Sequence, residues 1–296
     1  MRFGLQIPNF VAGDAPDALF ENAVAMAQAA EETGFDSVWV MDHFYQLPPM
    51  GGPDAPMFDA YTLLGALAAR TSRVRLGALV SGVTYRNPAH LAKIVTTLDV
   101  ISAGRAILGI GAAWYDVEHE GLGFDFPPAG ERLDRLEEAL QICRAMFREE
   151  APTFDGRYYR IHGARNVPPP VQDGGPAILV GGGGEKRTLQ LVARYADMAN
   201  FFGDPATIAH KVDVLRGHCE AVGRDPSEVT VSRLSTLVLT ADAAETAATK
   251  DFLRQATGEE PTTSNVGTAA ELAGQVEELI EAGVEYFIFN VPTGTP

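Results

Sequence analysis

A carboxylate and an imidazole stand next to each other in Met41-Asp42-His43-Phe44, at the end of a short β-rich run. Histidine titrates near neutral pH and a neighbouring charge tunes that titration, so this pair could take up or release a proton during a reaction. A structural role fits the same residues, with Asp42 capping the following segment and His43 facing solvent. The residue types alone leave both interpretations open.

Four consecutive glycines, residues 181–184, follow the apolar run Ala177–Val180 and precede a helical pattern. Main-chain N–H groups exposed at such a turn bind anions, and phosphate above all. Lys186 and Arg187 add positive charge directly after the glycines. The spacing matches neither the Gly-x-Gly-x-x-Gly turn nor the Gly-x-x-x-x-Gly-Lys-Ser/Thr loop, so both of those nucleotide sites lose support. A phosphate site of another kind is predicted, and a turn merely tightened by glycine is the alternative.

Two further apolar runs are followed by small or polar residues. Val80-Ser81-Gly82-Val83-Thr84 carries a glycine inside a strand pattern, which indicates a bulge or a close approach of the backbone to a ligand. Gly109-Ile110-Gly111-Ala112-Ala113-Trp114 leaves room for a flat ligand where a strand ends. The acidic residues around His119 are adjacent in the chain and rarely converge on one ion in that arrangement. We therefore expect His119 in a solvated loop, and no bound metal.

Eight β-rich runs alternate with helical patterns along the chain. They are Arg2–Ile7, Ser37–Met41, Val74–Val80, Arg105–Ile110, Ala177–Gly181, Asp197–Phe201, Glu228–Leu234 and Glu285–Val291. Several are apolar almost throughout, which is typical of parallel strands buried on both faces and joined by crossover helices. Eight such units favour an α/β fold of the closed (β/α)8 TIM-barrel type over an open doubly wound sheet. Active sites of such barrels form at the C-terminal ends of the strands, where the four segments above lie.

Two stretches interrupt the alternation. Residues 151–176 lack helical periodicity and include Thr153-Phe154-Asp155-Gly156-Arg157-Tyr158-Tyr159, a pattern typical of a short hairpin that turns at Asp-Gly. We interpret this stretch as an insertion after the fourth βα unit. Residues 241–265 are expected to form an irregular, mobile excursion. Because no linker divides the chain, we expect a single domain over residues 1–296.

Composition excludes several classes of function. Hydrophobic residues make up 46% of the chain and charged residues 21%, which excludes disorder for its bulk. The net charge of −16 repels nucleic-acid backbones and anionic lipids, so neither is an expected partner. Two cysteines cannot make a disulfide framework or a cysteine zinc site. With no signal-like apolar core at the N-terminus and no run of the roughly 20 residues that span a bilayer, we expect a cytoplasmic protein.

The four strand ends, in this order, resemble the bacterial luciferase-like superfamily, in particular its coenzyme F420-dependent oxidoreductases. The likeness covers nearly the whole chain. It is carried by Gly34-Phe35-Asp36-Ser37-Val38-Trp39, Asp42-His43-Phe44, Arg86-Asn87-Pro88-Ala89, the run from Gly104 to Trp114, and Gly181–Arg187. The resemblance implies an enzyme that transfers hydride between the reduced deazaflavin F420 and a small organic substrate.

The resemblance also implies roles for individual residues. Asp42 and His43 would lie beside the deazaflavin ring, and His43 would hydrogen-bond the ring or relay a proton. The Ser81-Gly82 step falls where the family places a non-proline cis peptide that backs the ring. The remaining implied cofactor contacts are Thr84 at the polar edge of the ring, Trp114 and Glu118 along the trough, Gly182, Gly183, Glu185, Lys186 and Arg187 at the phosphate, and Asn200 at the ribityl chain.

Alternatives remain open on cofactor and function. Flavin mononucleotide (FMN) also carries a phosphate, so the glycines do not separate it from F420, and in the same trough it would make a monooxygenase. A non-catalytic flavin-binding barrel is an alternative of another class, although barrel packing requires neither Asp42-His43 nor the glycine run. The resemblance further implies a homodimer and a separate reductase that supplies reduced cofactor. The family's sugar-phosphate dehydrogenases carry Glu where this chain has Trp114, which argues against a sugar phosphate as the substrate.

Overall fold

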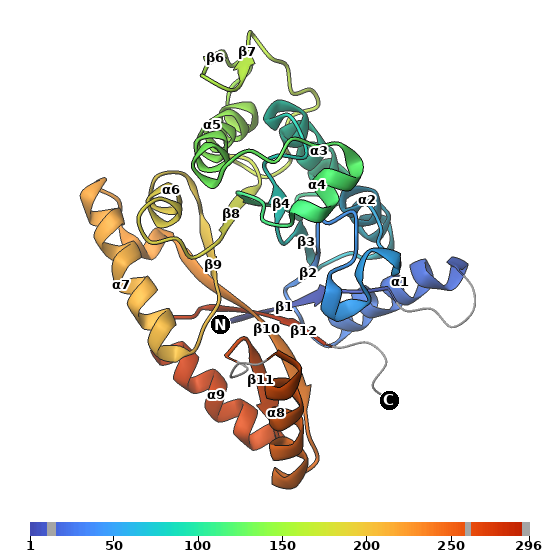
Figure 1. The fold of residues 1–296 in the computed structure, drawn as a ribbon. Helices are drawn as coiled ribbons and strands as arrows, with labels where there is room; N and C mark the ends of the chain where they lie inside the picture. Colours follow the sequence, from blue (N-terminus) through green and yellow to red (C-terminus); the bar gives the residue numbers. More distant parts are fainter. Residues whose placement is uncertain (11–15, 258–261, 292–296) are drawn as a thin grey trace.

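Eight parallel strands close into a barrel in the computed structural model, which describes residues 1–10, 16–257 and 262–291. The strands are β1 (Arg2–Ile7), β2 (Ser37–Val40), β3 (Arg75–Ala78), β5 (Ala106–Gly111), β8 (Ala177–Gly181), β9 (Met198–Phe201), β10 (Thr230–Leu239) and β12 (Tyr286–Asn290). Each pairs with the next in chain order, and β12 pairs with both β10 and β1, which closes the ring (Figure 1). The (β/α)8 fold expected from the sequence is confirmed, and every predicted strand coincides with an observed one.

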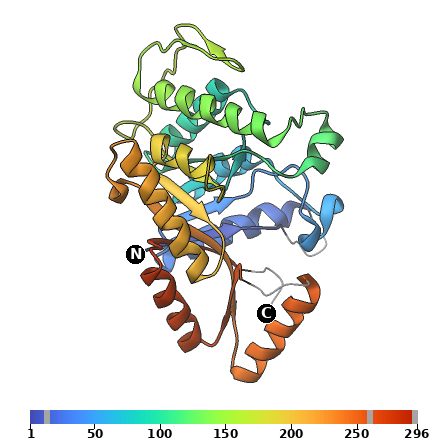
Figure 2. The ribbon, with the colours of Figure 1, turned by 60° about the vertical axis from the view of Figure 1, so that its left-hand side comes forward.

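Helices surround these strands on the outside of the barrel (Figures 1 and 2). They are α1 (Pro16–Glu32), α2 (Ala60–Arg70), α3 (Pro88–Ile101), α4 (Asp116–Leu122), α5 (Ala129–Arg148), α6 (Thr188–Tyr195), α7 (Pro205–Ala221), α8 (Ala243–Thr257) and α9 (Ala269–Glu281), with 3-10 turns at Pro48–Met50, Gly52–Asp54 and Pro226–Glu228. Helices α2, α3 and α7 each begin at an Asx cap: Asp59 accepts from Thr62 N, Asn87 from Ala89 N, and Asp204 from Thr207 N. In the described part of the chain, no helix is both long and apolar enough to cross a bilayer.

The barrel interior is filled with side chains. Trp39 is completely buried there, and its indole N–H donates to Ser37 Oγ. A Cβ atom on Gly77 of the neighbouring strand would lie 2.7 Å from the Trp39 ring, so only glycine leaves room for the indole. Because the interior is packed, a ligand has to bind at the C-terminal ends of the strands.

A short hairpin lies between α5 and β8, where the sequence predicted one. Strands β6 (Phe154–Asp155) and β7 (Arg160–Ile161) pair antiparallel, which confirms the hairpin. In both views it lies at the end of the molecule opposite α8 (Figures 1 and 2). Its interpretation as an insertion stays a prediction.

The expectation of an irregular excursion over residues 241–265 was wrong. Helix α8 covers most of this stretch, and β11 (Ser264–Gly267), which begins at its end, pairs in parallel with β10. The helix forms because Ala, Glu, Lys, Arg and Leu are good helix formers, and because Asp242 accepts the N–H groups of Ala244 and Glu245 at its start. Residues 258–261 of the stretch lie outside the described residues.

Candidate functional site

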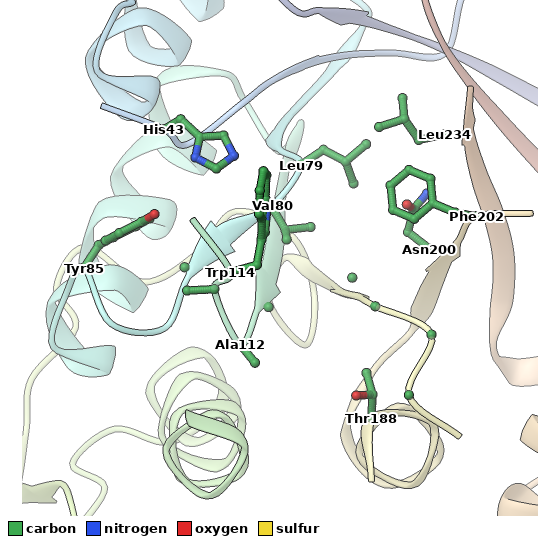
Figure 3. A pocket seen from close by; sticks show the side chains of 17 residues that line it. His43, Leu79, Val80, Tyr85, Ala112, Trp114, Thr188, Asn200, Phe202 and Leu234 are labelled. Carbon is green, nitrogen blue, oxygen red and sulfur yellow. The ribbon is translucent and has the colours of Figure 1, made fainter. Parts of the chain in front are cut away.

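A pocket of about 310 Å³ opens at the C-terminal ends of the strands (Figure 3). It is lined by His43, Leu79, Val80, Gly82, Tyr85, residues 111–114, residues 181–184, Thr188, Asn200, Phe202 and Leu234. Among these described lining residues there is no Asp, Glu, Lys or Arg. The pocket is therefore uncharged and largely apolar, and its polar groups are those of His43, Asn200, Thr188, Tyr85 and Trp114 together with the main chain.

His43 enters the pocket with one ring nitrogen already engaged. Its Nδ1 lies 2.7 Å from Glu118 Oε1. Trp114 and Tyr115 pack edge-to-face against the imidazole, each with a centroid distance of 5.7 Å. Figure 3 shows His43 across the pocket from Asn200, Phe202 and Leu234. The ring is therefore oriented by its neighbours, and Nε2 is the nitrogen left for a ligand.

Glu118 lies on α4 behind this ring and is completely buried. Its carboxylate accepts from His43, from the Tyr85 hydroxyl and from the main-chain N–H groups of Phe44 and Tyr45. Burial alone would raise the pKa of Glu118, but the hydrogen bonds from His43 and Tyr85 outweigh it and hold the pKa below its usual range. Glu118 is therefore ionised at neutral pH, and it does not line the pocket.

Asp42 is buried behind the pocket wall and paired with Arg86. Both carboxylate oxygens accept from the guanidinium, one of them at 2.9 Å, and Arg86 also lies over the Tyr61 ring. Burial raises the pKa of Asp42 although Arg86 opposes the shift. Ser81 is buried beside this pair, with its hydroxyl 2.8 Å from that of Tyr61. Neither Asp42 nor Ser81 lines the pocket. Their hydrogen bonds to Arg86 and Tyr61 instead stabilise the ends of the strands behind it.

Thr84 contacts His119 and not the pocket. The Thr84 hydroxyl lies 2.7 Å from His119 Nε2, and His119 Nδ1 lies 2.7 Å from the Tyr115 carbonyl oxygen. Since a carbonyl only accepts, Nδ1 carries a proton, and in the neutral ring Nε2 then accepts from Thr84. The expectation of a solvated loop at His119 was wrong, because α4 turns this ring inward against Tyr85 and Phe126, where it is completely buried.

The non-proline cis peptide lies at Leu79-Val80, and its expected position at Ser81-Gly82 was wrong. Ser81 and Gly82 form the short strand β4 (Ser81–Gly82), which pairs in parallel with the end of β5 and so has an extended backbone. Val80 packs closely against the pocket floor. A Cβ atom on Gly111 or on Gly181 would lie 2.9 Å from its methyl groups.

The glycine run forms the turn between β8 and α6, at the other end of the pocket. Gly182 has φ +123°, which favours glycine, and its N–H donates to the Asn200 carbonyl oxygen at 3.3 Å. The Lys211 ammonium group, on α7, donates to the Gly183 carbonyl oxygen at 2.8 Å. This lysine was missed by sequence reasoning, since only the packing of α7 beside α6 brings it to the turn.

None of the three charged residues after the glycines lines the pocket. Arg187 donates to Asp134 on α5 at 2.6 Å, and Glu185 contacts His210 on α7 at 3.2 Å. Lys186 is exposed. Their predicted phosphate contacts stay predictions. The Lys211 ammonium group, which contacts the turn at Gly183, also lies 3.9 Å from Glu185 Oε1.

Six of the predicted site residues come together around one pocket, and seven do not. Those that line it are His43, Gly82, Trp114, Gly182, Gly183 and Asn200. Those that do not are Asp42, Ser81, Thr84, Glu118, Glu185, Lys186 and Arg187. Sequence reasoning assigned no role to the lining residues Tyr85, Thr188 and Leu234. Within residues 1–10, 16–257 and 262–291, no group of three or more His, Cys, Asp or Glu side chains could hold a metal ion.

Comparison with families and curated proteins gives three findings. The model of a family described as luciferase-like monooxygenase matches residues 1–285. An F420-dependent glucose-6-phosphate dehydrogenase of Kineococcus radiotolerans is 40% identical over 172 residues, which are 55% of this chain and 49% of that protein. An uncharacterized protein of Mycobacterium tuberculosis is 32% identical over 214 residues, 68% of this chain and 74% of that one. The chain thus spans about half the length of the dehydrogenases it matches.

Two solved structures share the fold over nearly their whole length. One is an F420-dependent secondary alcohol dehydrogenase in complex with an F420-acetone adduct, with a TM-score of 0.82, 22% identity, and coverage of 98% of this chain and 93% of that one. The other is a monooxygenase from Streptomyces bottropensis, with a TM-score of 0.81, 22% identity, and coverage of 98% and 92%. At this identity the likeness shows a common architecture.

Proposed function

The chain belongs to the luciferase-like monooxygenase family, and from that premise we propose that it is an oxidoreductase that uses coenzyme F420 to transfer hydride to or from a small, uncharged organic substrate. The observation that carries this proposal is His43, which faces an apolar pocket with its other ring nitrogen bound to an ionised carboxylate. A hydride transfer needs such a group, because a proton has to move with the hydride when an alcohol and a carbonyl interconvert.

The pocket fits a flat ring with a phosphate tail. Two glycines at its floor leave no room for a larger residue. A Cβ atom on Gly82 would lie 2.6 Å from the Tyr85 ring, and one on Gly111 would lie 2.9 Å from Val80, so either substitution would displace the neighbouring side chain. At the other end, the turn of residues 181–184 and Lys211 offer N–H groups and a cation for the phosphate. F420, when bound, supplies a ring carbon that gives or accepts hydride.

The apolar lining supports an uncharged substrate. Trp114, Phe202 and Leu234 lie around the space that His43 faces, and no cation among the described lining residues would hold a substrate phosphate. Leaving a phosphate unpaired in such a pocket is costly. The relatives named glucose-6-phosphate dehydrogenases therefore suggest the cofactor for this chain, and not the substrate.

Binding and turnover together test the proposal. Purified protein is titrated with F420 and separately with FMN, while the fluorescence of each ligand is followed. We expect F420 to bind, and short secondary alcohols to reduce it faster than glucose 6-phosphate does. Binding of FMN alone would favour the monooxygenase alternative, and binding of neither would end the proposal. If the physiological direction is reduction of the substrate, a separate reductase has to supply the reduced cofactor.

A further inference from the structure

The carboxylate of Glu118 divides its four donors between its two oxygens. Oε2 accepts the main-chain N–H groups of Phe44 at 2.7 Å and of Tyr45 at 3.2 Å. Oε1 accepts from His43 Nδ1 at 2.7 Å and from the Tyr85 hydroxyl. Glu118 has no accessible surface, so these four groups are its whole hydrogen-bonding environment in the described structure.

This arrangement determines which nitrogen of His43 carries a proton. An ionised carboxylate only accepts hydrogen bonds, so His43 Nδ1 has to be the donor in the 2.7 Å contact. In the neutral imidazole, Nε2 then carries no proton and presents its lone pair to the pocket. The rings of Trp114 and Tyr115 keep the imidazole in this orientation.

We propose that Glu118 is a positioning residue that sets the tautomer of His43, and that it acts on the reaction through His43 and not by contact with the cofactor. The step from tautomer to turnover rests on the proposed function; the tautomer itself does not.

The tautomer matters because only a bare Nε2 can accept a proton. When an alcohol is oxidised, its O–H bond breaks and an N–H bond forms at Nε2, while the electron pair of the C–H bond leaves with its hydrogen as hydride to the oxidised F420. The imidazolium that results is stabilised by the carboxylate of Glu118. In the reverse direction the imidazolium returns the proton to the carbonyl oxygen. With the other tautomer, Nε2 already holds a hydrogen and cannot start the oxidation.

Replacing Glu118 by glutamine should invert the tautomer with almost no change in shape. The N–H groups of Phe44 and Tyr45 always donate, so the amide oxygen of the variant has to take their side. The amide NH2 group then faces His43 and donates to Nδ1. The neutral imidazole of His43 then adopts the tautomer with its proton on Nε2, because Nδ1 has to accept the hydrogen bond from the amide.

Nitrogen NMR of histidine-labelled protein tests this without any cofactor. The chain has six histidines, and the His43 signals are assigned by their loss in His43→Ala. In spectra of the neutral imidazole, recorded at a pH above the transition of the ring, we expect a protonated Nδ1 and a bare Nε2 in the wild type, and the opposite in Glu118→Gln. Glu120→Gln is the matched control, since it makes the same change at an exposed position of the same helix and should leave the tautomer as it is. A wild-type Nε2–H tautomer, or an unchanged tautomer in Glu118→Gln, would overturn the proposal.

A second variant covers the case in which Glu118→Gln does not fold. Tyr85→Phe removes the other donor on Oε1 and leaves the carboxylate in place. The tautomer of His43 should therefore be that of the wild type. An inverted tautomer in Tyr85→Phe would mean that Tyr85, and not Glu118, orients the ring.

Turnover then separates a positioning role from a merely structural one. We expect Glu118→Gln to lower F420-dependent alcohol oxidation by roughly 10²- to 10⁴-fold, as orienting carboxylates of catalytic histidines do. In a His43→Ala background the same change should have little further effect. An equal loss in both backgrounds would contradict action through His43. Failure of F420 to bind would instead contradict the proposed function and leave the tautomer result standing.

Discussion

At the scale of single residues, His43 is the side chain from which we expect the largest effect on rate. Replacing His43 by Ala should lower turnover by roughly 10²- to 10⁴-fold, because a proton acceptor in the transition state is lost. The dissociation constant of F420 should change by less than about tenfold, since one neutral hydrogen bond contributes about 0.5–1.5 kcal/mol. Steady-state rates and fluorescence titration measure the two effects separately. Wild-type turnover in this variant would mean that His43 contributes to packing and not to the reaction.

Lys211 is the cation that we expect to hold the phosphate of the cofactor. Its ammonium group already lies at the glycine turn, 2.8 Å from the Gly183 carbonyl oxygen. Lys211→Met should weaken F420 binding by roughly 10- to 150-fold, because a charge-assisted hydrogen bond contributes about 1.5–3 kcal/mol. Lys186→Met is the control, an exposed lysine after the same turn. If titration shows that Lys186→Met costs more affinity than Lys211→Met, the assignment made from the sequence is the better one.

Strand ends together with the family resemblance were enough to predict that His43, Gly82, Trp114 and Asn200 line one pocket. They could not predict what Glu118 does. Three of its four partners lie 73 to 75 residues earlier in the chain and Tyr85 lies 33 residues earlier, and only the inward face of α4 brings its carboxylate to them. A residue that acts through a buried hydrogen bond has no sequence pattern of its own.

At the scale of elements, Glu31 joins helix α1 to the connection between α2 and β3. Its carboxylate accepts the main-chain N–H groups of Ser72, Arg73 and Val74, and the Ser72 hydroxyl. Burial would raise the pKa of Glu31, but these hydrogen bonds outweigh it and lower the pKa to about 2 from 4.5. Because the folded state has the lower pKa, the contribution to stability is complete above about pH 4.5 and is lost as the pH falls toward 2.

Glu31→Gln should therefore destabilise the fold in a pH-dependent way. We expect its free energy of unfolding to be lower than that of the wild type by about 1–2 kcal/mol near neutral pH, a value reduced for solvent screening. The difference should shrink as the pH falls below about 4.5. Urea unfolding over a pH series measures it, with Glu32→Gln, an exposed neighbour, as the control. A difference that is the same at all pH values would show that the charge of Glu31 is not involved.

Elements were predictable where apolar runs define them. The buried strands were found because parallel strands of a barrel are apolar on both faces. Helix α8 was missed because Phe252 and Leu253 are the only large apolar residues in 241–265, although the intrinsic helix propensity of this stretch is high. The position of the cis peptide at Leu79-Val80 was missed by two residues, because the family pattern locates a segment and not a single peptide bond.

At the scale of the whole molecule, closure of the barrel depends on pairing between the two ends of the chain. Arg2 on β1 is in register with Tyr286 on β12, and the residues around either position do not predict this pairing. The count of eight strand–helix units was nevertheless enough to predict closure, because an open doubly wound sheet usually has fewer strands and the (β/α)8 barrel has eight. The overall architecture could therefore be predicted from the sequence, whereas the contacts inside the site could not.

The net charge of −16 should oppose the approach of an anionic cofactor, while the local cation Lys211 acts only at the turn. At about 10 mM salt the field extends about 30 Å, and at 0.15 M about 8 Å. We therefore expect the association rate of F420, measured by stopped-flow fluorescence, to rise by a few-fold as salt increases over this range. The same deazaflavin without its phosphate tail is the control, and its rate should not change. An association rate that falls with salt would mean that positive charge at the pocket mouth, and not the net charge, governs the encounter.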